Sequence, residues 1–126
     1  RTLKNISKDI KIFNAKYIAK NLNNFNFNNE YLFFCGLGSP NEFENTLKKY
    51  RFKIKEKFIF PDHYNFLNKD IRQMKQIAKT KNLEIITTEK DYLRLSKSNQ
   101  KGIKFLKIEL KVKNYANFLK FLKKNL

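Results

Sequence analysis

Apolar and polar positions along this chain follow two periodicities, one typical of strands and one typical of helices. Residues 31–35 are apolar without interruption, which is the pattern of a central strand covered by helices on both faces. In residues 52–60, apolar side chains alternate with lysines, which predicts a half-buried strand. Three further strands are expected at residues 10–18, 83–87 and 103–110.

Between these predicted strands, apolar residues recur at the spacing typical of helices. Ser39 followed by Pro40, with Glu42 three residues after the serine, is a full capping box and predicts a helix. Asn68 and Thr88 are the expected N-cap residues of the next two helices, and a last helix is expected over residues 115–122. Alternation of strand and helix predicts an α/β fold, with a mainly parallel sheet flanked by helices in a Rossmann-like three-layer arrangement.

The length of 126 residues suits a single α/β domain. Within it, residues 1–30 are expected to hold an N-terminal strand and an asparagine-rich surface connection. The chain opens on Arg1 without a charged and apolar leader, so we expect an excerpt of a longer protein rather than a secreted precursor. No apolar run approaches the ~20 residues of a membrane span. The single cysteine, Cys35, excludes a disulfide within the chain.

The formal net charge of +17 attracts phosphates, anionic lipid head groups and nucleic acids alike. The lysines are scattered and form no compact run, so the charge alone does not choose among these partners. One function to weigh is therefore a basic nucleic-acid-binding α/β module, in which exposed aromatic side chains such as Phe25, Phe27 and Tyr64 stack on bases. No nucleic-acid-binding motif accompanies them.

Three unusual loops follow three of the predicted strands. In parallel sheets, ligands gather at the carboxyl ends of the strands, so we expect a site on the rim that these loops share. They are residues 36–40 (the glycine loop), residues 61–66 (the histidine loop) and residues 87–91 (the threonine loop).

The histidine loop carries the only histidine of the chain. Pro61 fixes its own φ and restricts Phe60, so the strand is expected to end there and to present Asp62 and His63 on the loop. A histidine titrates near neutrality and an adjacent carboxylate can fix its tautomer, which suits proton transfer or the orientation of a second acid. The same pair also fits a solvated loop histidine without chemistry, so the residues alone leave both explanations open.

The other two loops also allow a structural and a functional explanation. Gly36 and Gly38 precede a capped helix, where backbone N–H groups can approach an anion, but tight loop geometry explains both glycines without a ligand. The threonine loop combines hydroxyl, carboxylate and ammonium groups, and fits either a helix cap with a local ion pair or contact with a phosphorylated substrate. Its candidate site residues are Thr88, Glu89, Lys90 and Asp91.

No P-loop pattern and no metal-ligand spacing occurs in the sequence, so this chain alone is expected to bind neither ATP nor a metal ion.

Four motifs in a fixed order distinguish this sequence, at residues 12–16, 34–43, 60–64 and 86–92. Together they resemble the C-terminal half of the tetraacyldisaccharide 4'-kinase (lipid A 4'-kinase) family, and the resemblance covers nearly the whole chain. Leu37 and Ser39 stand where the family pattern has isoleucine and asparagine, and neither change removes a reactive group.

The resemblance implies a two-domain, P-loop-type enzyme of Gram-negative bacteria at the cytoplasmic face of the inner membrane. Residues 1–126 would be its C-terminal domain. Such an enzyme moves the γ-phosphoryl group of ATP, with Mg²⁺, to the 4'-hydroxyl of a tetraacyldisaccharide 1-phosphate. Its Walker motifs and catalytic aspartate lie in the N-terminal half, so this chain alone is expected to be inactive. The implied partners are that N-terminal P-loop domain, the anionic lipid A precursor and, peripherally, the inner membrane.

By the same resemblance, His63 matches the family's histidine that pairs with the catalytic aspartate across the domain cleft, and Asp62 is its motif neighbour. Residues 88–91 match a family motif whose role we do not assign. No nucleic acid is expected under this interpretation. Two alternatives remain, the basic nucleic-acid-binding module and a degenerate remnant or scaffold half that needs a separately encoded kinase half.

Overall fold

The computed structural model describes residues 15–36, 40–112 and 122–123. The predicted capping residue Ser39 and most of the predicted last helix lie outside the described residues, as do residues 10–14 of the first predicted strand. Within the described residues, no helix combines the length and the apolar character that crossing a membrane requires. The chain forms two compact units, one made of Arg1–Lys20 with Ile108–Leu126 and the other of Asn21–Lys107.

The first unit contains an antiparallel pair of strands. β1 (Ala15–Ala19) pairs with β6 (Ile108–Val112), so that Ala15 lies opposite Val112 and Ala19 opposite Ile108. Just beyond the pairing, Lys20 Nζ lies 3.8 Å from Glu109 Oε2. The strand predicted over residues 10–18 is therefore confirmed in its second half.

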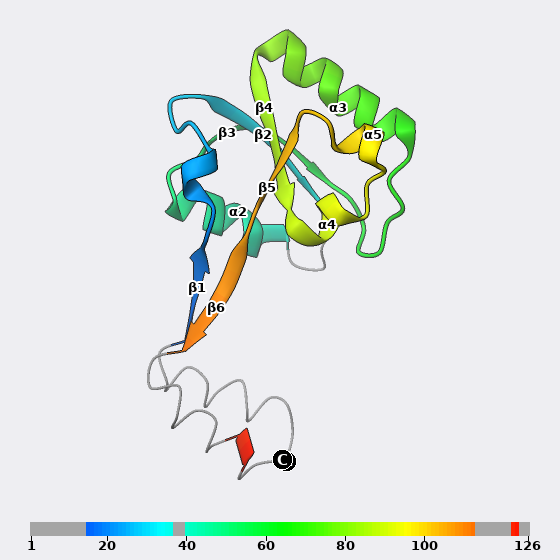
Figure 1. The fold of residues 1–126 in the computed structure, drawn as a ribbon. Helices are drawn as coiled ribbons and strands as arrows, with labels where there is room; N and C mark the ends of the chain where they lie inside the picture. The colour runs from blue at the N-terminus through cyan, green and yellow to red at the C-terminus, as the bar shows by residue number, and fades with distance from the viewer. Residues whose placement is uncertain (1–14, 37–39, 113–121, 124–126) are drawn as a thin grey trace. The chain divides into compact units, whose positions relative to one another are not determined.

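A four-stranded parallel sheet is the frame of the second unit (Figure 1). Its strands are β2 (Glu30–Cys35), β3 (Lys53–Ile59), β4 (Leu83–Thr88) and β5 (Ile103–Leu106). Their spatial order is β3-β2-β4-β5, and every pairing within this sheet is parallel. The predicted parallel sheet is thus confirmed, and the carboxyl ends of its strands share one edge.

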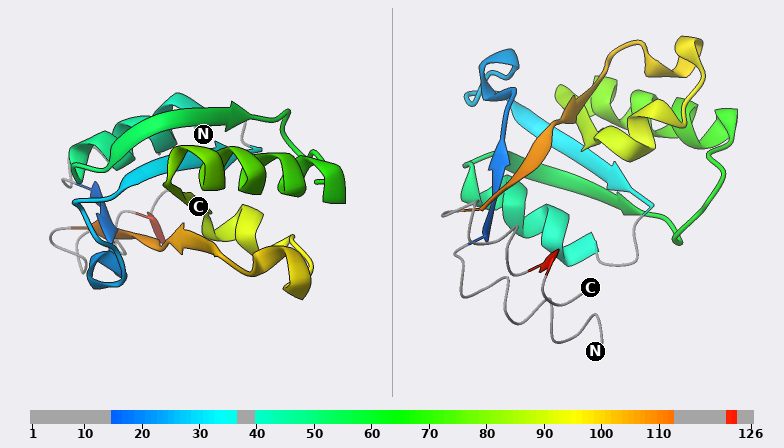
Figure 2. Two further views of the ribbon diagram at one scale, coloured as in Figure 1. Left: turned by 90° about the horizontal axis from the view of Figure 1, so that it is seen from above. Right: turned by 60° about the horizontal axis from the view of Figure 1, so that its bottom comes forward.

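β2 is buried on both faces because helices cover this sheet on either side. Residues 31–35 are fully excluded from solvent. On one face, the ring of Phe33 lies 5.7 Å from that of Phe43 on α2 (Pro40–Lys49). On the other face, Phe34 joins a core cluster that includes Ile71 of α3 (Asn68–Lys81). The two helices lie on opposite sides of the sheet (Figure 2), which confirms the predicted three-layer α/β arrangement.

The last predicted strand is interrupted, which corrects the expectation of one strand over residues 103–110. β5 ends at Leu106 and β6 begins at Ile108. At the break, the N–H of Lys107 donates to Oδ1 of Asn21 over 2.8 Å, and Nδ2 of Asn21 donates to the carbonyl of Phe105 over 2.8 Å. The asparagine side chain thus takes up hydrogen bonds that a neighbouring strand would otherwise make.

The helix caps agree with the sequence at one position and differ at another. Thr88 is the N-cap of α4 (Glu89–Leu93) as predicted, because its Oγ1 accepts from the N–H of Asp91 over 3.1 Å. α3 begins one residue earlier than predicted, with Leu67 and not Asn68 at its N-cap. The carboxylate of Asp70 accepts from the N–H of Leu67 over 2.9 Å and so supplies the cap expected from Asn68. A further short helix, α5 (Lys97–Gln100), precedes β5.

Candidate functional site

Three loops meet at the carboxyl edge of the parallel sheet, around Gly36. The N–H of Gly36 donates to Oδ2 of Asp91 over 2.9 Å, which joins the end of β2 to α4. A Cβ added at Gly36 would lie 3.3 Å from the carbonyl oxygen of Pro61 and 3.5 Å from the ring of Phe66, so the histidine loop also passes close by. The shared rim that the parallel topology predicted is therefore confirmed.

Asp91 is the buried polar centre of this rim, fully excluded from solvent. Its Oδ2 accepts from the N–H of Gly36 and, over 3.0 Å, from the hydroxyl of Thr88. Its Oδ1 has no hydrogen bond among the residues that the structure describes and lies 3.8 Å from Nη1 of Arg94. A buried carboxylate has lost its hydration and needs compensation, which here comes from the guanidinium.

Arg94 connects Asp91 to the histidine loop. Its Nη2 donates to the carbonyl oxygen of Tyr64 over 2.6 Å and to Oδ1 of Asn65 over 3.4 Å. Its guanidinium carbon lies 5.8 Å from the centre of the Phe66 ring. Sequence reasoning missed this residue, because an arginine three positions after an aspartate on a helix looks like an ordinary surface ion pair.

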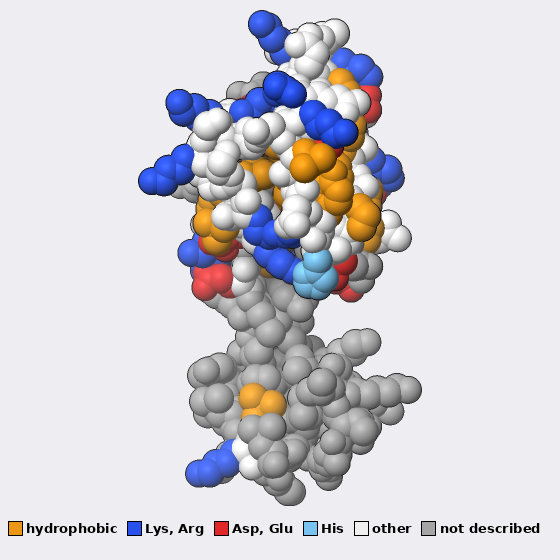
Figure 3. Space-filling view, turned by 90° about the vertical axis from the view of Figure 1, so that its right-hand side faces the viewer, with side chains coloured by type: hydrophobic (Ala, Val, Ile, Leu, Met, Phe, Trp, Pro, Cys, Tyr) orange, Lys and Arg blue, Asp and Glu red, His pale blue; other side chains and the backbone are white. Residues whose placement is uncertain are grey.

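His63 stands at a tight turn after β3. The N–H of Tyr64 donates to the carbonyl of Pro61 over 3.1 Å, and His63 has a φ of 62°, a left-handed conformation that a glycine would adopt more easily. Its side chain is 82% exposed, and Nε2 lies 3.6 Å from Oδ2 of Asp62. Figure 3 shows the imidazole at the molecular surface. The loop therefore presents Asp62 and His63 together, away from the core.

Aromatic packing supports this turn from below. The rings of Phe60 and Tyr64 stack with centroids 5.0 Å apart, and Phe66 meets them nearly edge-on at 5.1 and 5.7 Å. The hydroxyl of Tyr64 donates to Oδ2 of Asp70 over 2.7 Å. That bond, followed by the one from the N–H of Leu67, lowers the pKa of Asp70, and the same bond raises the pKa of Tyr64. The exposed imidazole is thus carried by a turn whose backbone is held in place by packing and hydrogen bonds.

The predicted site residues fall into two neighbouring groups and a remainder. The hydrogen-bonded group consists of Gly36, Thr88 and Asp91. The exposed pair consists of Asp62 and His63. Glu89 is half-buried and Lys90 is exposed, and no hydrogen bond or ion pair joins either side chain to the rim within the described part of the chain. Gly38 lies outside the described residues.

The described side chains offer no set of ligands for a metal ion, since no group of three or more His, Cys, Asp or Glu residues among them is suitably placed. The rim instead offers an exposed imidazole beside a carboxylate, on a backbone that an arginine anchors. This arrangement suits hydrogen bonding to, or proton exchange with, a group that approaches from outside.

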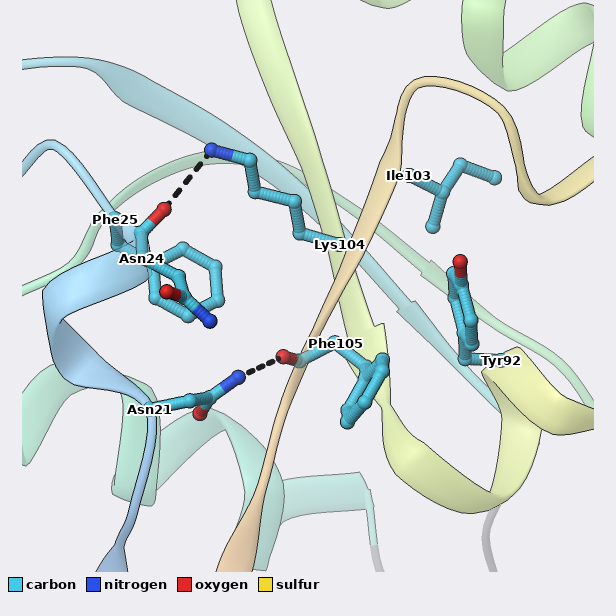
Figure 4. A pocket seen from close by; sticks show the side chains of 7 residues that line it. All are labelled: Asn21, Asn24, Phe25, Tyr92, Ile103, Lys104 and Phe105. Atoms are coloured by element: carbon cyan, nitrogen blue, oxygen red, sulfur yellow. Dashed lines mark hydrogen bonds between the residues drawn. The ribbon is translucent and has the colours of Figure 1, made fainter.

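A pocket of about 310 Å³ lies away from these residues, between η1 (Leu22–Asn24), Tyr92 and β5 (Figure 4). Within it, Nζ of Lys104 donates to the carbonyl of Asn24 over 3.0 Å, and the amide of Asn21 donates to the carbonyl of Phe105. We assign this pocket no role, because none of the predicted site residues lines it.

The aromatic side chains considered for base stacking are engaged within the fold. Phe25 is buried, which contradicts its expected exposure, and its ring meets that of Phe52 edge-on at 5.2 Å. Phe27 also packs on Phe52, at 4.9 Å. Tyr64 is half-buried, stacked on Phe60 and bonded to Asp70. Of the three aromatic side chains, Phe25 is therefore not available for stacking on a base.

Known proteins similar to this chain share one description. Residues 3–126 match the family model of the tetraacyldisaccharide-1-P 4'-kinase. The tetraacyldisaccharide 4'-kinase of Pelagibacter ubique is 38% identical over 115 residues, which are 91% of this chain and 37% of that protein. That of Rickettsia canadensis is 39% identical over 105 residues, which are 82% of this chain and 31% of that protein. This chain thus spans about a third of the length of the curated relatives that it matches.

Among solved structures, the "apo" form of LpxK from Aquifex aeolicus in complex with ATP is 25% identical, with a TM-score of 0.49 over 76% of this chain and 27% of that one.

Proposed function

This chain belongs to the tetraacyldisaccharide-1-P 4'-kinase family, and from that premise we propose that it serves the acceptor side of a lipid-sugar kinase. The whole kinase transfers the γ-phosphoryl group of ATP to the 4'-hydroxyl of a tetraacyldisaccharide 1-phosphate. One observation carries the proposal: the only imidazole of the chain is 82% exposed and is held by a packed turn on the rim. Such a group is accessible to another part of the kinase and to a substrate.

We propose that His63 orients a carboxylate and adjusts its basicity, and that this carboxylate accepts the proton of the 4'-hydroxyl. Asp62 faces Nε2 of the ring, and Nδ1 has no hydrogen bond among the described residues, so it is open to a carboxylate from another part of the kinase. Phosphoryl transfer depends mostly on positioning and on charge stabilisation, and a base must lie within hydrogen-bond reach of the proton it takes. A histidine that holds this carboxylate in place would position it and keep it within hydrogen-bond reach of the proton.

We place the binding of ATP and Mg²⁺ in a P-loop domain that lies outside this chain. Among the described residues, no three His, Cys, Asp or Glu side chains are grouped so as to hold a metal ion, and the sequence contains no P-loop pattern. When bound elsewhere in the kinase, ATP and Mg²⁺ supply the phosphoryl group and neutralise its charge. In this proposal the net charge of +17 attracts the anionic lipid A precursor and favours peripheral contact with the cytoplasmic face of the inner membrane.

The test is a chimera in which this chain replaces the matching segment of the Pelagibacter ubique relative. We expect the chain alone to show no turnover and the chimera to phosphorylate tetraacyldisaccharide 1-phosphate. In the chimera, His63→Ala is expected to lower kcat by about 100-fold or more. Lys101→Ala is the matched control, because this exposed residue precedes β5 at the opposite edge of the sheet.

Two results would contradict the proposal. Turnover of ATP by this chain alone would overturn the placement of the nucleotide site elsewhere. An unchanged kcat in the His63→Ala chimera would remove His63 from the mechanism.

A further inference from the structure

We propose that Arg94 is a positioning residue that, together with Asp91, fixes the histidine loop in its working geometry. The inference rests on the proposed function of His63 and gives the threonine loop a task in the same reaction. No contact joins Arg94 to the imidazole among the described residues; it holds the backbone next to it.

A continuous set of contacts runs from the centre of the sheet to the turn that carries His63. β2 leads into Gly36, whose N–H holds Oδ2 of Asp91 over 2.9 Å. Oδ1 of Asp91 faces Nη1 of Arg94 at 3.8 Å, and Nη2 of Arg94 donates to the carbonyl of Tyr64 over 2.6 Å. Tyr64 follows His63 directly in the sequence, so the anchored carbonyl is one peptide away from the left-handed residue.

Asp91 is a suitable anchor because its own carboxylate is immobilised. It is fully buried, and its Oδ2 accepts from the hydroxyl of Thr88 as well as from Gly36. Its Oδ1 has no hydrogen bond within the described part of the chain, which leaves this oxygen to the guanidinium. Removing the cation that faces a buried carboxylate is costly, which favours the observed arrangement of Asp91 and Arg94.

An arginine suits this position because its guanidinium offers donors in a fixed planar relation. One nitrogen faces Asp91 while the other bonds to Tyr64, and the group lies over the ring of Phe66 at 5.8 Å. The Arg94 side chain is 28% exposed, and its bond to the carbonyl of Tyr64 lies at the surface. A lysine presents a single point charge and cannot serve both partners, which makes Arg94→Lys the informative variant.

The primary test measures order in the histidine loop of the full 126-residue chain by nuclear magnetic resonance. In the unmodified chain we expect backbone order parameters of about 0.85 for residues 62–66, and in Arg94→Lys values below about 0.6. Amides of α3 and β4 should keep their values. Because the chain has one histidine, its ring resonances report the turn without overlap from others. Lys97→Ala on α5 is the matched control, since it removes an exposed cation away from the loop.

A second variant guards against loss of the fold. Replacing Arg94 alone by an uncharged residue would leave Asp91 buried without a cation. Asp91→Asn combined with Arg94→Leu leaves no buried charge, retains an acceptor for Gly36, and still removes the donor to Tyr64. We expect this double variant to fold with a loosened histidine loop. A folded double variant whose His63 resonances and loop order match the unmodified chain would overturn the proposal.

Kinetics of the chimera separate this inference from the function on which it rests. Arg94→Lys is expected to lower kcat by about 10- to 100-fold with the KM for ATP unchanged, because a misplaced catalytic group slows the reaction without altering nucleotide contacts. A loosened loop in a chimera that has no activity from the start would support the positioning role and defeat the proposed function. An active, His63-dependent chimera whose loop and kcat are unmoved by Arg94→Lys would defeat the positioning role alone.

Discussion

The amide of Gly36 and the carboxylate of Asp91 are joined by a buried hydrogen bond of 2.9 Å across 55 positions of sequence. The same glycine packs against the histidine loop, because a Cβ on it would lie 3.3 Å from the carbonyl oxygen of Pro61. One residue without a side chain therefore allows the loops after β2, β3 and β4 to meet.

Gly36→Ala should disturb the rim as a whole. The added methyl group presses on a backbone oxygen, which cannot rotate away as a side chain can, so we expect a loss of roughly 1–3 kcal/mol in the free energy of unfolding. Urea unfolding measures this loss, and the His63 resonances should shift. Gly102→Ala is the control: it has a φ of 78° and nothing within 4 Å, so strain of about 1 kcal/mol is expected without any change at His63. Unaltered His63 resonances in Gly36→Ala would contradict the close packing of the loops.

His63→Gly should lower kcat of the chimera while leaving the free energy of unfolding nearly unchanged. A left-handed residue other than glycine is strained by roughly 1 kcal/mol, but glycine also gains freedom in the unfolded chain, so the two effects nearly cancel. We expect the free energy of unfolding to change by less than about 1 kcal/mol, while kcat of the chimera falls as in His63→Ala. Arg51→Gly, at a φ of 67°, should have the same small effect on stability with kcat unchanged. A large loss of stability in His63→Gly would show that the imidazole serves the fold.

The contribution of Asp70 to the free energy of unfolding should depend on pH in the acid range. Hydrogen bonds from Tyr64 and from the N–H of Leu67 lower the pKa of Asp70 from its usual 3.8. The stabilisation is therefore present in full well above pH 3.8 and is lost as the pH falls through the lowered value of the folded state. Asp70→Asn should cost roughly 0.5–1 kcal/mol at neutral pH, kept small by solvent screening, and the difference from the unmodified chain should vanish in acid. Urea unfolding across this pH range measures it; a difference that is constant with pH would exclude the carboxylate as its source.

Tyr31 should ionise only at high pH. Burial, and after it the negative charge of Glu84, raise the pKa of Tyr31 to about 12. A raised folded-state pKa means that the contribution of Tyr31 is complete below the ordinary value of 10 and is lost as the pH climbs toward 12. Spectrophotometric titration should show this late step and Tyr31→Phe should abolish it. The variant should also cost about 1 kcal/mol at neutral pH, because the hydroxyl donates to the carbonyl of Asn26 over 2.8 Å. A titration curve that is the same in Tyr31→Phe would refute the assignment.

The sequence located the rim because its signals there are local. The apolar run at residues 31–35 identified the central strand, and Pro61 marked the turn that exposes His63. The cap formed by Thr88 and Asp91 spans only three positions, so spacing alone revealed it. Once these strands were recognised as parallel, their loops had to share an edge.

The remaining features depend on partners that are distant in the sequence. The pairing of Asn21 with Phe105 and Lys107, which interrupts the last predicted strand, crosses 84 and 86 positions. Arg94 reaches Tyr64 across 30 positions, and Phe25 is buried by a ring from Phe52. Periodicity indicates which face of an element is apolar but not which distant residue will cover it. These contacts could therefore not be predicted from the sequence pattern.

The turn at His63 draws its packing from Phe60, Tyr64 and Phe66, while the imidazole itself points into solvent. The packing of this turn therefore does not depend on the imidazole, although the left-handed backbone at residue 63 restricts which residues fit there. Under the proposed function, a related chain that has exchanged this one ring would keep the same fold and lose its activity. The fold alone would then not distinguish an active relative from an inactive one, whereas the residue at position 63 would.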